Sequence, residues 1–579
     1  MKRFSTLAVA AAWLGAAGGA LAQAVPAQPE QTFSVVANDS IAARDYLVAA
    51  AHPLAVEVGR DVLAAGGSAA DAAIAVQFML NLVEPQSSGI GGGAFALYWD
   101  ASEGRLTSFD GREKAPMAAG PDYFLKEDGT PMGFWEAVIG GRSVGVPGTL
   151  KLLETLHAKH GRTPWADLVE PAIRQAEQGF QISLRMASSI ADAQERGLAD
   201  FAEARGYFFT ETGAPKPAGT VLKNPAFART LRLIAAHGSA PFYEGAIAGD
   251  IVAAVRGAAN PGMLTLEDMA AYEVVERAPV CVEYRAHDVC GMGPPSSGGL
   301  TVGQILGMLE NFEMGDAPTV GGYHLFIEAS RLAYADRGLY MADSDFVRMP
   351  TEGLIDPLYL DSRAALIETD QAMETAAPGT PPFREGMLLA PDTQAERPGT
   401  THFVIVDRHG DMVSMTTTIE TGFGSRVMTG GFLLNNELTD FSFVPMVDGK
   451  PVANRVEPGK RPRSSMAPTV VLRDGAPVML TGSPGGARII PYVALSLIGV
   501  IDWGLDPQAA IDMGHVTNLN GPTDLEEGTG AAEMAAELEA MGHEVRISNL
   551  NSGLHVVTIG PEGMLGAADG RREGSVAGE

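Results

Sequence analysis

Cysteine, positive charge and long apolar runs are all scarce in this sequence of 579 residues. Two cysteines are too few for a disulfide-dense scaffold. Lysine and arginine number 41 against 70 acidic residues; this net charge of −29, with no basic cluster, argues against nucleic-acid binding. Beyond residue 22, the longest apolar run is 489–501, which contains Pro491 and is too short to span a bilayer. With 46% hydrophobic residues, the chain is not a disordered tail.

The N-terminus has the features of a secretory signal peptide. Lys2 and Arg3 precede a weakly apolar stretch over residues 7–16, and a small–x–small sequence ends at Ala22. We expect residues 1–22 to be removed rather than retained as an anchor, because glycine and alanine make the stretch only weakly apolar. The mature protein is then expected to be periplasmic, or secreted, with no membrane span.

Cys281 and Cys290 bracket a sequence that alternates like a strand pair. With a two-residue turn at Arg285 and Ala286, the two cysteines face each other as a non-hydrogen-bonded pair, whose Cα atoms approach to about 4.5 Å. That separation is within the range of a disulfide, and an oxidising compartment permits one. The alternatives are a disulfide and two buried thiols.

Residues 40–340 are mostly helical in pattern and contain glycine-rich loops. We expect a helical hairpin over 53–82, with its turn at 66–68. The glycine cluster in 84–95 lacks the Lys-Ser/Thr of a phosphate loop, so it predicts tight backbone packing before a strand at 94–99. His324 and Glu328 stand at helical spacing but without a HExxH pattern, which favours an ion-paired helix over a metal site.

The composition and the hydrophobic pattern of the chain change before residue 400. The stretch 374–398 is rich in proline, glycine, threonine and alanine, and predicts a solvated connector. Strand-like alternation then begins abruptly, with strands expected over 401–407 and 411–419 and a turn at 408–410. A long connector that ends at Gly399 and Thr400 is a place where a chain can be cut.

Thr400 carries the chemistry if that cut occurs. A threonine hydroxyl is a weak nucleophile and needs a base. Cleavage of the Gly399–Thr400 bond frees the α-amine of Thr400, whose ordinary pKa of about 7.7–8.0 leaves part of it neutral near pH 7. Before cleavage, the same hydroxyl can attack the Gly399 carbonyl, which has no Cβ beside it. One residue can therefore serve both maturation and catalysis.

Several motifs in this order resemble γ-glutamyltransferases, which are N-terminal-nucleophile hydrolases. The matching segments cover nearly the whole mature chain: EPQSSGIGGG at 84–93, GREKAP at 111–116, PPSSGG at 294–299, TTHF at 400–403, LLNNELTDF at 433–441, RPRSSM at 461–466 and GSPGG at 482–486. One such segment is weak evidence, whereas seven in the family's order identify the family.

The resemblance implies a role for each matching residue. Thr400 corresponds to the nucleophile and first residue of the small subunit, and Thr418 to a threonine whose hydroxyl lies near it. The other implied roles are binding of the substrate α-carboxylate by Arg112, Ser464 and Ser465, binding of the α-ammonium by Glu420, Glu437 and Asp440, and stabilisation of the oxyanion by Gly485 and Gly486. A γ-glutamyl group ends in a zwitterion, so donors are needed on one side and carboxylates on the other.

The sequence also departs from some relatives. Glu420 replaces an asparagine and Glu437 a glutamine, and the extra charge should sharpen the preference for a free amine. Residues 442–460 occupy the place of a pocket lid but contain Phe443 and no tyrosine, so a lid is not expected. Arg463 stands next to Ser464 where many relatives have leucine.

The resemblance implies an α+β fold, a four-layer αββα sandwich built from a large subunit (23–399) and a small subunit (400–579) as one intertwined unit. The expected enzyme transfers the γ-glutamyl group of glutathione, or of a similar compound, to water or to an amino-acid or peptide amine, without metal or cofactor. The alternatives are an acylase for glutaryl-type side chains of cephalosporins and a peptide-binding relative that no longer cleaves itself.

Overall fold

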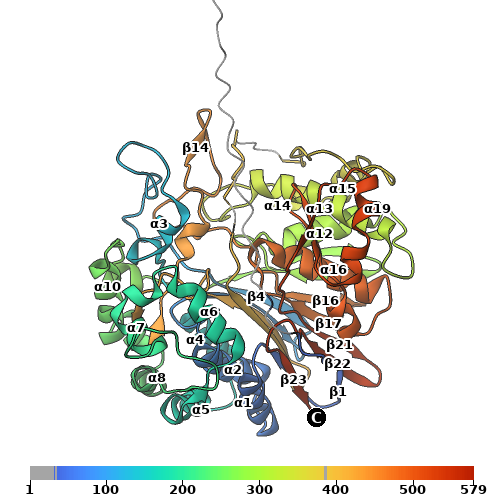
Figure 1. Ribbon diagram of the computed structural model, residues 1–579. Coiled ribbons are helices and arrows are strands. Elements are labelled where there is room, and N and C mark those ends of the chain that lie inside the picture. Colours follow the sequence, from blue (N-terminus) through green and yellow to red (C-terminus); the bar gives the residue numbers. More distant parts are fainter. Residues whose placement is uncertain (1–31, 33–34, 384–387, 395) are drawn as a thin grey trace, which may run out of the picture.

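The computed structural model describes residues 32, 35–383, 388–394 and 396–579 (Figure 1). The expected signal peptide, residues 1–22, lies outside these residues. Two seven-stranded antiparallel sheets form the centre of the molecule, and helices cover them. The predicted α+β class is therefore confirmed.

The first sheet holds Thr400 near its middle. In spatial order its strands are β23 (Ser575–Gly578), β2 (Leu47–Ala50), β10 (Thr400–Val406), β11 (Met412–Thr418), β3 (Gly93–Asp100), β4 (Arg105–Gly111) and β7 (Val275–Arg277). The strands predicted at 401–407 and 411–419 are thus confirmed to within a residue or two as β10 and β11. Their β-branched residues are buried on both faces, as expected for central strands.

The second sheet packs against the first. In spatial order its strands are β1 (Ile41–Ala43), β22 (Gly563–Ala568), β21 (His555–Gly560), β17 (Ala476–Gly482), β16 (Thr469–Arg473), β9 (His287–Gly291) and β8 (Val280–Tyr284). Side chains of both sheets, including Leu97, Val404 and Leu480, form a shared core between them. Each sheet contains strands from before and after residue 399.

Helices pack on the outer face of each sheet. Beside the first sheet lie α1 (Pro53–Ala64), α2 (Ala69–Val83), α4 (Thr149–His160), α5 (Trp165–Gln178), α8 (Pro225–His237) and α10 (Ala246–Gly257). Beside the second lie α12 (Gly298–Leu309), α13 (Val320–Tyr340), α16 (Ile489–Ile501) and α17 (Pro507–Asp512). The apolar run 489–501 is thus α16, and within the described part of the chain no helix has the length and apolarity needed to cross a membrane.

Shorter elements connect these layers. They include α3 (Phe134–Val138), α6 (Leu184–Gln194), α7 (Ala202–Phe208), α9 (Ala240–Tyr243), α11 (Leu266–Ala270), α14 (Thr351–Leu354), α15 (Pro357–Ala364), α18 (Gly530–Glu533), α19 (Ala535–Ala540), β5 (Phe180–Gln181), β6 (Val221–Leu222), β12 (Met428–Thr429), β13 (Phe432–Leu433), β14 (Met446–Val447), β15 (Lys450–Pro451), β18 (Val516–Asn518), β19 (Thr523–Glu526) and β20 (Val545–Ser548).

The predicted helical hairpin and the glycine cluster are both confirmed. Ser68 caps α2 in a capping box with Asp71. In the cluster that follows α2, a Cβ on Gly91 would lie 2.1 Å from the Leu433 carbonyl oxygen, and one on Gly92 would lie 1.9 Å from that of Thr418. Only glycine permits this approach, so the cluster packs the backbone of β3 against the end of β11.

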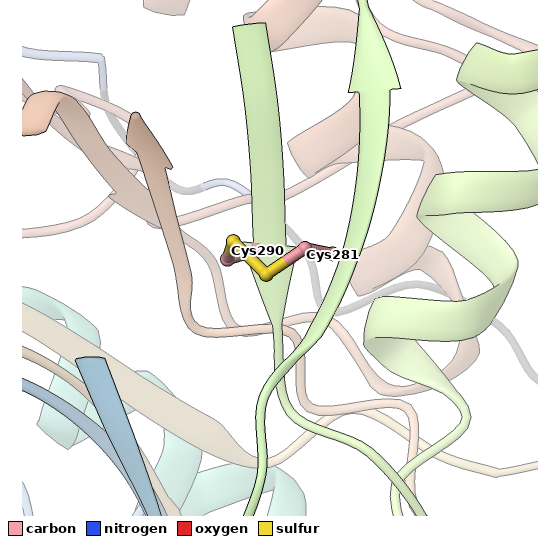
Figure 2. Close-up of a disulfide and its surroundings, with 2 residues drawn as sticks. All are labelled: Cys281 and Cys290. Atoms are coloured by element: carbon pink, nitrogen blue, oxygen red, sulfur yellow. A yellow bond between two sulfur atoms is a disulfide. The ribbon is translucent and has the colours of Figure 1, made fainter. Parts of the chain in front are cut away.

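Strands β8 and β9 form the hairpin expected around the cysteines. Cys281 pairs with Cys290, the turn lies at Arg285 and Ala286, and a disulfide joins the two cysteines across a Cα–Cα distance of 4.0 Å (Figure 2). Of the two alternatives left open by the sequence, the structure has the disulfide. The bond ties the edge strand β8 to its neighbour.

Candidate active site

The Gly399–Thr400 bond lies where β10 begins, opposite the end of β11. Thr400 pairs with Thr418 in the sheet register, and their Oγ1 atoms are 3.4 Å apart. The Thr418 hydroxyl donates a hydrogen bond to the Gly399 carbonyl oxygen at 2.9 Å and accepts one from the Glu420 N–H at 2.8 Å. The Thr400 hydroxyl and the carbonyl that it would attack are thus both held by one hydroxyl group.

Most described residues of the predicted connector, 374–398, are exposed or half-buried as expected, but the end of the connector is buried. Thr400 is only 4% exposed, and Glu396 only 5%. A Cβ on Gly399 would lie 2.0 Å from the Glu420 carbonyl oxygen, so the chain has no room for a side chain there. Asp392 and Glu396 of the connector form ion pairs with the buried arginines Arg337 and Arg463, which compensate part of the cost of burying these carboxylates. An external protease has little access to this bond.

A small pocket surrounds Thr400 and brings together nearly all of the predicted site residues. Its lining consists of Arg112, Glu396, Arg397, Thr400, Thr418, Glu420, Glu437, Asp440, Ser464, Ser465, Met466, Gly486 and Ile489. Of the residues predicted for catalysis, substrate binding and cleavage, Gly399 and Gly485 do not line the pocket, although each directly precedes a residue that does. A Cβ on Gly486 would lie 2.6 Å from the carbonyl carbon of Arg397, so Gly486 packs directly against the connector.

We call Glu420, Glu437 and Asp440 the acidic side of the pocket. Glu437 and Asp440 lie on a short 3₁₀ turn (Glu437–Asp440), and Glu420 follows β11 with a φ of 77°. Such a φ is unusual for a residue other than glycine and is typical of functional sites. Burial raises the pKa of each of the three carboxyl groups well above its usual range.

Arg112 follows β4 and binds this acidic side. Its guanidinium contacts Glu437 and lies 2.6 Å from Asp440 Oδ2, and it also donates to the carbonyls of Pro462 and Arg463. Burial opposes its charge, but the two carboxylates outweigh burial and raise the pKa of Arg112. Glu437 Oε2 and Asp440 Oδ1 have no hydrogen-bond partner among the described residues. These two oxygens are available to a ligand's ammonium group.

We call Arg337, Arg463 and Ser465 the arginine side, although of these three only Ser465 lines the pocket and the two arginines lie behind Glu396. All three hold the carboxylate of Glu396: Ser465 and Arg337 make short contacts with it, and Arg463 Nε lies 3.2 Å away. Burial disfavours the charge on Glu396, but the two arginines outweigh it and lower its pKa to about 2. Ser464 makes a different bond, since its Oγ accepts from the Met466 N–H at 3.1 Å as in a turn.

The sequence did not identify Glu396 or Arg337 as site residues. Glu396 lies in a segment of weak pattern, and its position three residues before the predicted cut was the available signal. Arg337 lies on the ion-paired helix α13, where its pattern indicated structure. Arg463 had been noted as a departure, and the structure directs its side chain to the connector through Asp392 and Glu396.

Residues 442–460 contribute nothing to the lining of the pocket. They contain the short hairpin of β14 and β15, which projects outward in Figure 1. Phe443 packs instead on Phe124, with ring centroids 4.5 Å apart.

The ion-paired helix expected around His324 and Glu328 is confirmed as α13. Glu328 Oε1 lies 3.0 Å from Arg331 Nε. His324, Glu328 and His543 form a buried cluster whose potential ligand atoms lie within 4.8 Å of one another. However, His324 Nδ1 and His543 Nε2 hydrogen bond directly at 2.8 Å, which leaves no space for an ion between those two nitrogens.

Several known proteins are similar to this chain in sequence and in fold. A family model described as Gamma-glutamyltranspeptidase matches residues 55–579. The glutathione hydrolase proenzyme of Bacillus subtilis (strain 168) is 39% identical over 92% of each chain, and the acylase ACY 1 proenzyme of Pseudomonas sp. (strain SE83) is 33% identical over 91% of this chain and 92% of its own. The structure of a cephalosporin acylase from Bacillus halodurans superposes with a TM-score of 0.83 at 29% identity, covering 95% of this chain and 99% of that one. The chain therefore belongs to the γ-glutamyltranspeptidase family of enzymes.

Proposed function

We propose that this protein is a γ-glutamyltransferase and glutathione hydrolase that matures by cutting its own Gly399–Thr400 bond. One observation carries the proposal: the nucleophile, the carbonyl of the bond to be cut and an acidic cluster suited to an ammonium group meet in one buried pocket. The name of the Bacillus subtilis relative, a glutathione hydrolase proenzyme, supports both the activity and the processing.

Self-cleavage starts from the geometry of the uncut chain. Thr400 Oγ1 attacks the Gly399 carbonyl carbon, the C–N bond breaks, and the hydroxyl proton passes to the departing nitrogen, which becomes the α-amine of Thr400. The hydrogen bond from Thr418 to the carbonyl oxygen favours this attack because it polarises the carbonyl. Water then hydrolyses the ester, which gives a large subunit of residues 23–399 and a small subunit of residues 400–579.

Catalysis in the mature enzyme repeats the same acyl transfer on a substrate. Thr400 Oγ1 attacks the γ-amide carbonyl of glutathione or a related compound, and the free α-amine takes the hydroxyl proton and delivers it to the leaving amine. The N–H groups of Gly485 and Gly486 stabilise the oxyanion. Water, or the amine of an amino acid or peptide, then resolves the γ-glutamyl ester. No step of this reaction requires a metal or an organic cofactor.

The acidic side sets the choice between γ-glutamyl and glutaryl donors. Both donors end in a carboxylate, but only the γ-glutamyl group carries an α-ammonium. Unpaired acceptor oxygens on Glu437 and Asp440 suit that ammonium, and a glutaryl chain would leave them without a partner. An acylase for glutaryl side chains stays the second candidate, because an acylase and a cephalosporin acylase are among the relatives.

The remaining parts of the proposal concern assembly and location. The order of helix, sheet, sheet and helix supports a four-layer αββα sandwich of the N-terminal-nucleophile type, assembled from both products of the cut. We propose export to the periplasm, or secretion, on the basis of the N-terminal sequence. The disulfide between Cys281 and Cys290 supports an oxidising compartment.

Two measurements test this function. Fresh protein on a denaturing gel should show two fragments, whereas an uncut chain would favour a binding protein that no longer cleaves itself. Mature enzyme should release aniline from a γ-glutamyl anilide faster than from the matching glutaryl anilide. Faster release from the glutaryl compound would show that the enzyme is an acylase of the second kind.

A further inference from the structure

Three arginines surround the side chain of Trp135, which lies on α3 beside the connector. The guanidinium carbons of Arg196, Arg397 and Arg426 lie 5.0, 5.4 and 5.5 Å from a ring centroid of this tryptophan, which are cation–π distances. Within the described part of the chain, none of these three guanidinium groups forms an ion pair with a carboxylate. We call these four residues the tryptophan cluster.

Arg426 is the most deeply buried arginine of the tryptophan cluster. It is 1% exposed, and its hydrogen bonds go to the backbone carbonyls of Gly422, Gly424 and Arg196. Its φ of 73° is unusual for a residue other than glycine and is typical of functional sites. Burial, with the charge of Arg196, lowers the pKa of Arg426 to about 9. A buried guanidinium without a carboxylate is unfavourable, so it would gain from an incoming anion.

The tryptophan cluster lines a cavity of about 560 Å³ that extends to the bond we propose is cut. This volume lies in the range of small-molecule sites. Gly399, whose carbonyl Thr400 would attack, is part of the lining. Ile547 and Asn549, which are exposed, line it as well, so the cavity is open to solvent.

Positive charge predominates in this cavity. Among its described lining residues, Asp192 is the only acid, whereas Arg185 is already paired with Glu84. Glu420, on the acidic side of the pocket around Thr400, acts on Arg397 and Arg426 but does not outweigh their burial. Opposite charges therefore lie on the two sides of the reacting carbonyl.

We propose that Trp135, Arg196 and Arg426 form an anion site that binds a carboxylate of the leaving or accepting amine, and that the enzyme therefore prefers acidic peptides in this role. This inference rests on the proposed function, because it assumes acyl transfer at Thr400. Arg397 precedes the cut, so it contributes only while the connector is in place. The other three residues of the tryptophan cluster lie outside the connector.

The arrangement of charge favours an acidic peptide over a neutral one. An accepting amine must reach the acyl group on Thr400, where the acidic side repels any carboxylate that the peptide carries. The tryptophan cluster offers that carboxylate guanidinium groups, which are charge-assisted donors. Contact with the face of Trp135 holds these groups without using their N–H donors, which stay available to the ligand.

Calorimetry on the uncut Thr400→Ala protein tests the site, because the cavity is present before the cut. Glycyl-glutamate carries two carboxylates, and glycyl-glutaminamide is its neutral analogue of nearly equal size. We expect glycyl-glutamate to bind about tenfold or more tightly than the analogue. Arg196→Gln should weaken binding of glycyl-glutamate about fivefold or more, and Arg196→Lys should restore part of it because the charge returns.

The matched control is Arg229→Gln, at an exposed position of α8 that does not line the cavity. It removes the same charge and should leave binding unchanged. Equal binding of the two peptides, or undiminished binding after Arg196→Gln, would overturn the anion site. This experiment involves no turnover, so a mature enzyme that proves to be an acylase for glutaryl donors would contradict the proposed function and leave the anion site standing.

The mature enzyme offers a second test, which separates recognition of the acceptor from folding. With a γ-glutamyl anilide as donor, the two peptides compete as acceptors, and mass spectrometry measures the ratio of their γ-glutamyl products. The wild-type enzyme should favour glycyl-glutamate, and Arg196→Gln should lower this ratio about fivefold, whereas Arg229→Gln should leave it unchanged. An unchanged ratio in Arg196→Gln would show that Arg196 does not select acidic acceptors and would overturn the proposal.

Discussion

The acidic side and the arginine side of the pocket differ in where their counterions lie. Arg112, which pairs with Glu437 and Asp440, follows β4 and belongs to the body of the fold. Glu396, which pairs with Arg337 and Arg463, belongs to a connector without helix or strand in its described residues. The first set of ion pairs lies outside the connector, whereas the second depends on a residue of the connector.

This difference concerns how the connector is held before it is cut. In the uncut chain, the arginine side holds the connector and thereby fixes the bond to be cut beside Thr418. On the acidic side, Arg112 counters the charge of Glu437 and Asp440, and none of these three residues belongs to the connector.

The largest expected effect comes from removing the nucleophile. Thr400→Ala should abolish both the cut at Gly399–Thr400 and all turnover, because the hydroxyl serves both reactions. The arginine side would then stay filled by Glu396. Denaturing gels and an anilide assay measure the two outcomes.

Thr401→Val is a matched control for that variant. Thr401 is the next residue of β10, is fully buried, and has an Oγ1 without a hydrogen-bond partner among the described residues. This nearly isosteric change should leave cutting and turnover in place. Cutting that continues in the Thr400→Ala protein would show that another group, or another protein, breaks the bond.

A smaller effect is expected from neutralising one carboxylate of the acidic side. Asp440→Asn should lower kcat/KM for a γ-glutamyl anilide by about 10- to 100-fold, because a hydrogen bond to a charged group contributes about 1.5–3 kcal/mol. It should affect a glutaryl anilide much less, since that donor has no ammonium. Steady-state kinetics with both donors measure the difference.

The control for this change is Asp448→Asn in the exposed turn between β14 and β15. It removes the same charge away from the pocket and should leave both donors unaffected. If Asp440→Asn slowed both donors equally, the acidic side would act through structure, and the contrast between the two sides of the pocket would fail.

The sequence alone predicted the structural elements that depend on residues close together in the chain. The capping residues of α2, the alternation of β10 and β11, and the two-residue turn between the cysteines all depend on neighbouring residues. The resemblance to the family also named ten of the residues in or beside the pocket, from Arg112 to Gly486. At each position of these motifs, the residue type is the one that its chemical role requires.

The contacts of the connector were not predictable in this way. Its composition indicated a solvated segment, and the ion pairs that bury it join residues far apart in the sequence: Glu396 with Arg337 and Arg463. A tertiary interaction overrides the local pattern there. Arg463 was visible as a departure from relatives, but the direction of its side chain depends on partners that no local pattern reveals.

The smallest expected effect concerns the stability that the arginine side gives the uncut chain. Folding lowers the pKa of Glu396 from 4.5 to about 2, because Arg337 and Arg463 outweigh its burial. A carboxyl with a lowered pKa stabilises the fold fully above its unfolded pKa and loses that contribution as pH falls through its folded value. In the Thr400→Ala background, Glu396→Gln should therefore reduce the free energy of unfolding most above pH 4.5 and least near pH 2. Denaturant titrations over this range measure the difference, with the exposed Glu244→Gln as the control for loss of one carboxylate. If the two substitutions followed the same course with pH, Glu396 would not be held by the arginine side, and the contrast in counterions would be lost.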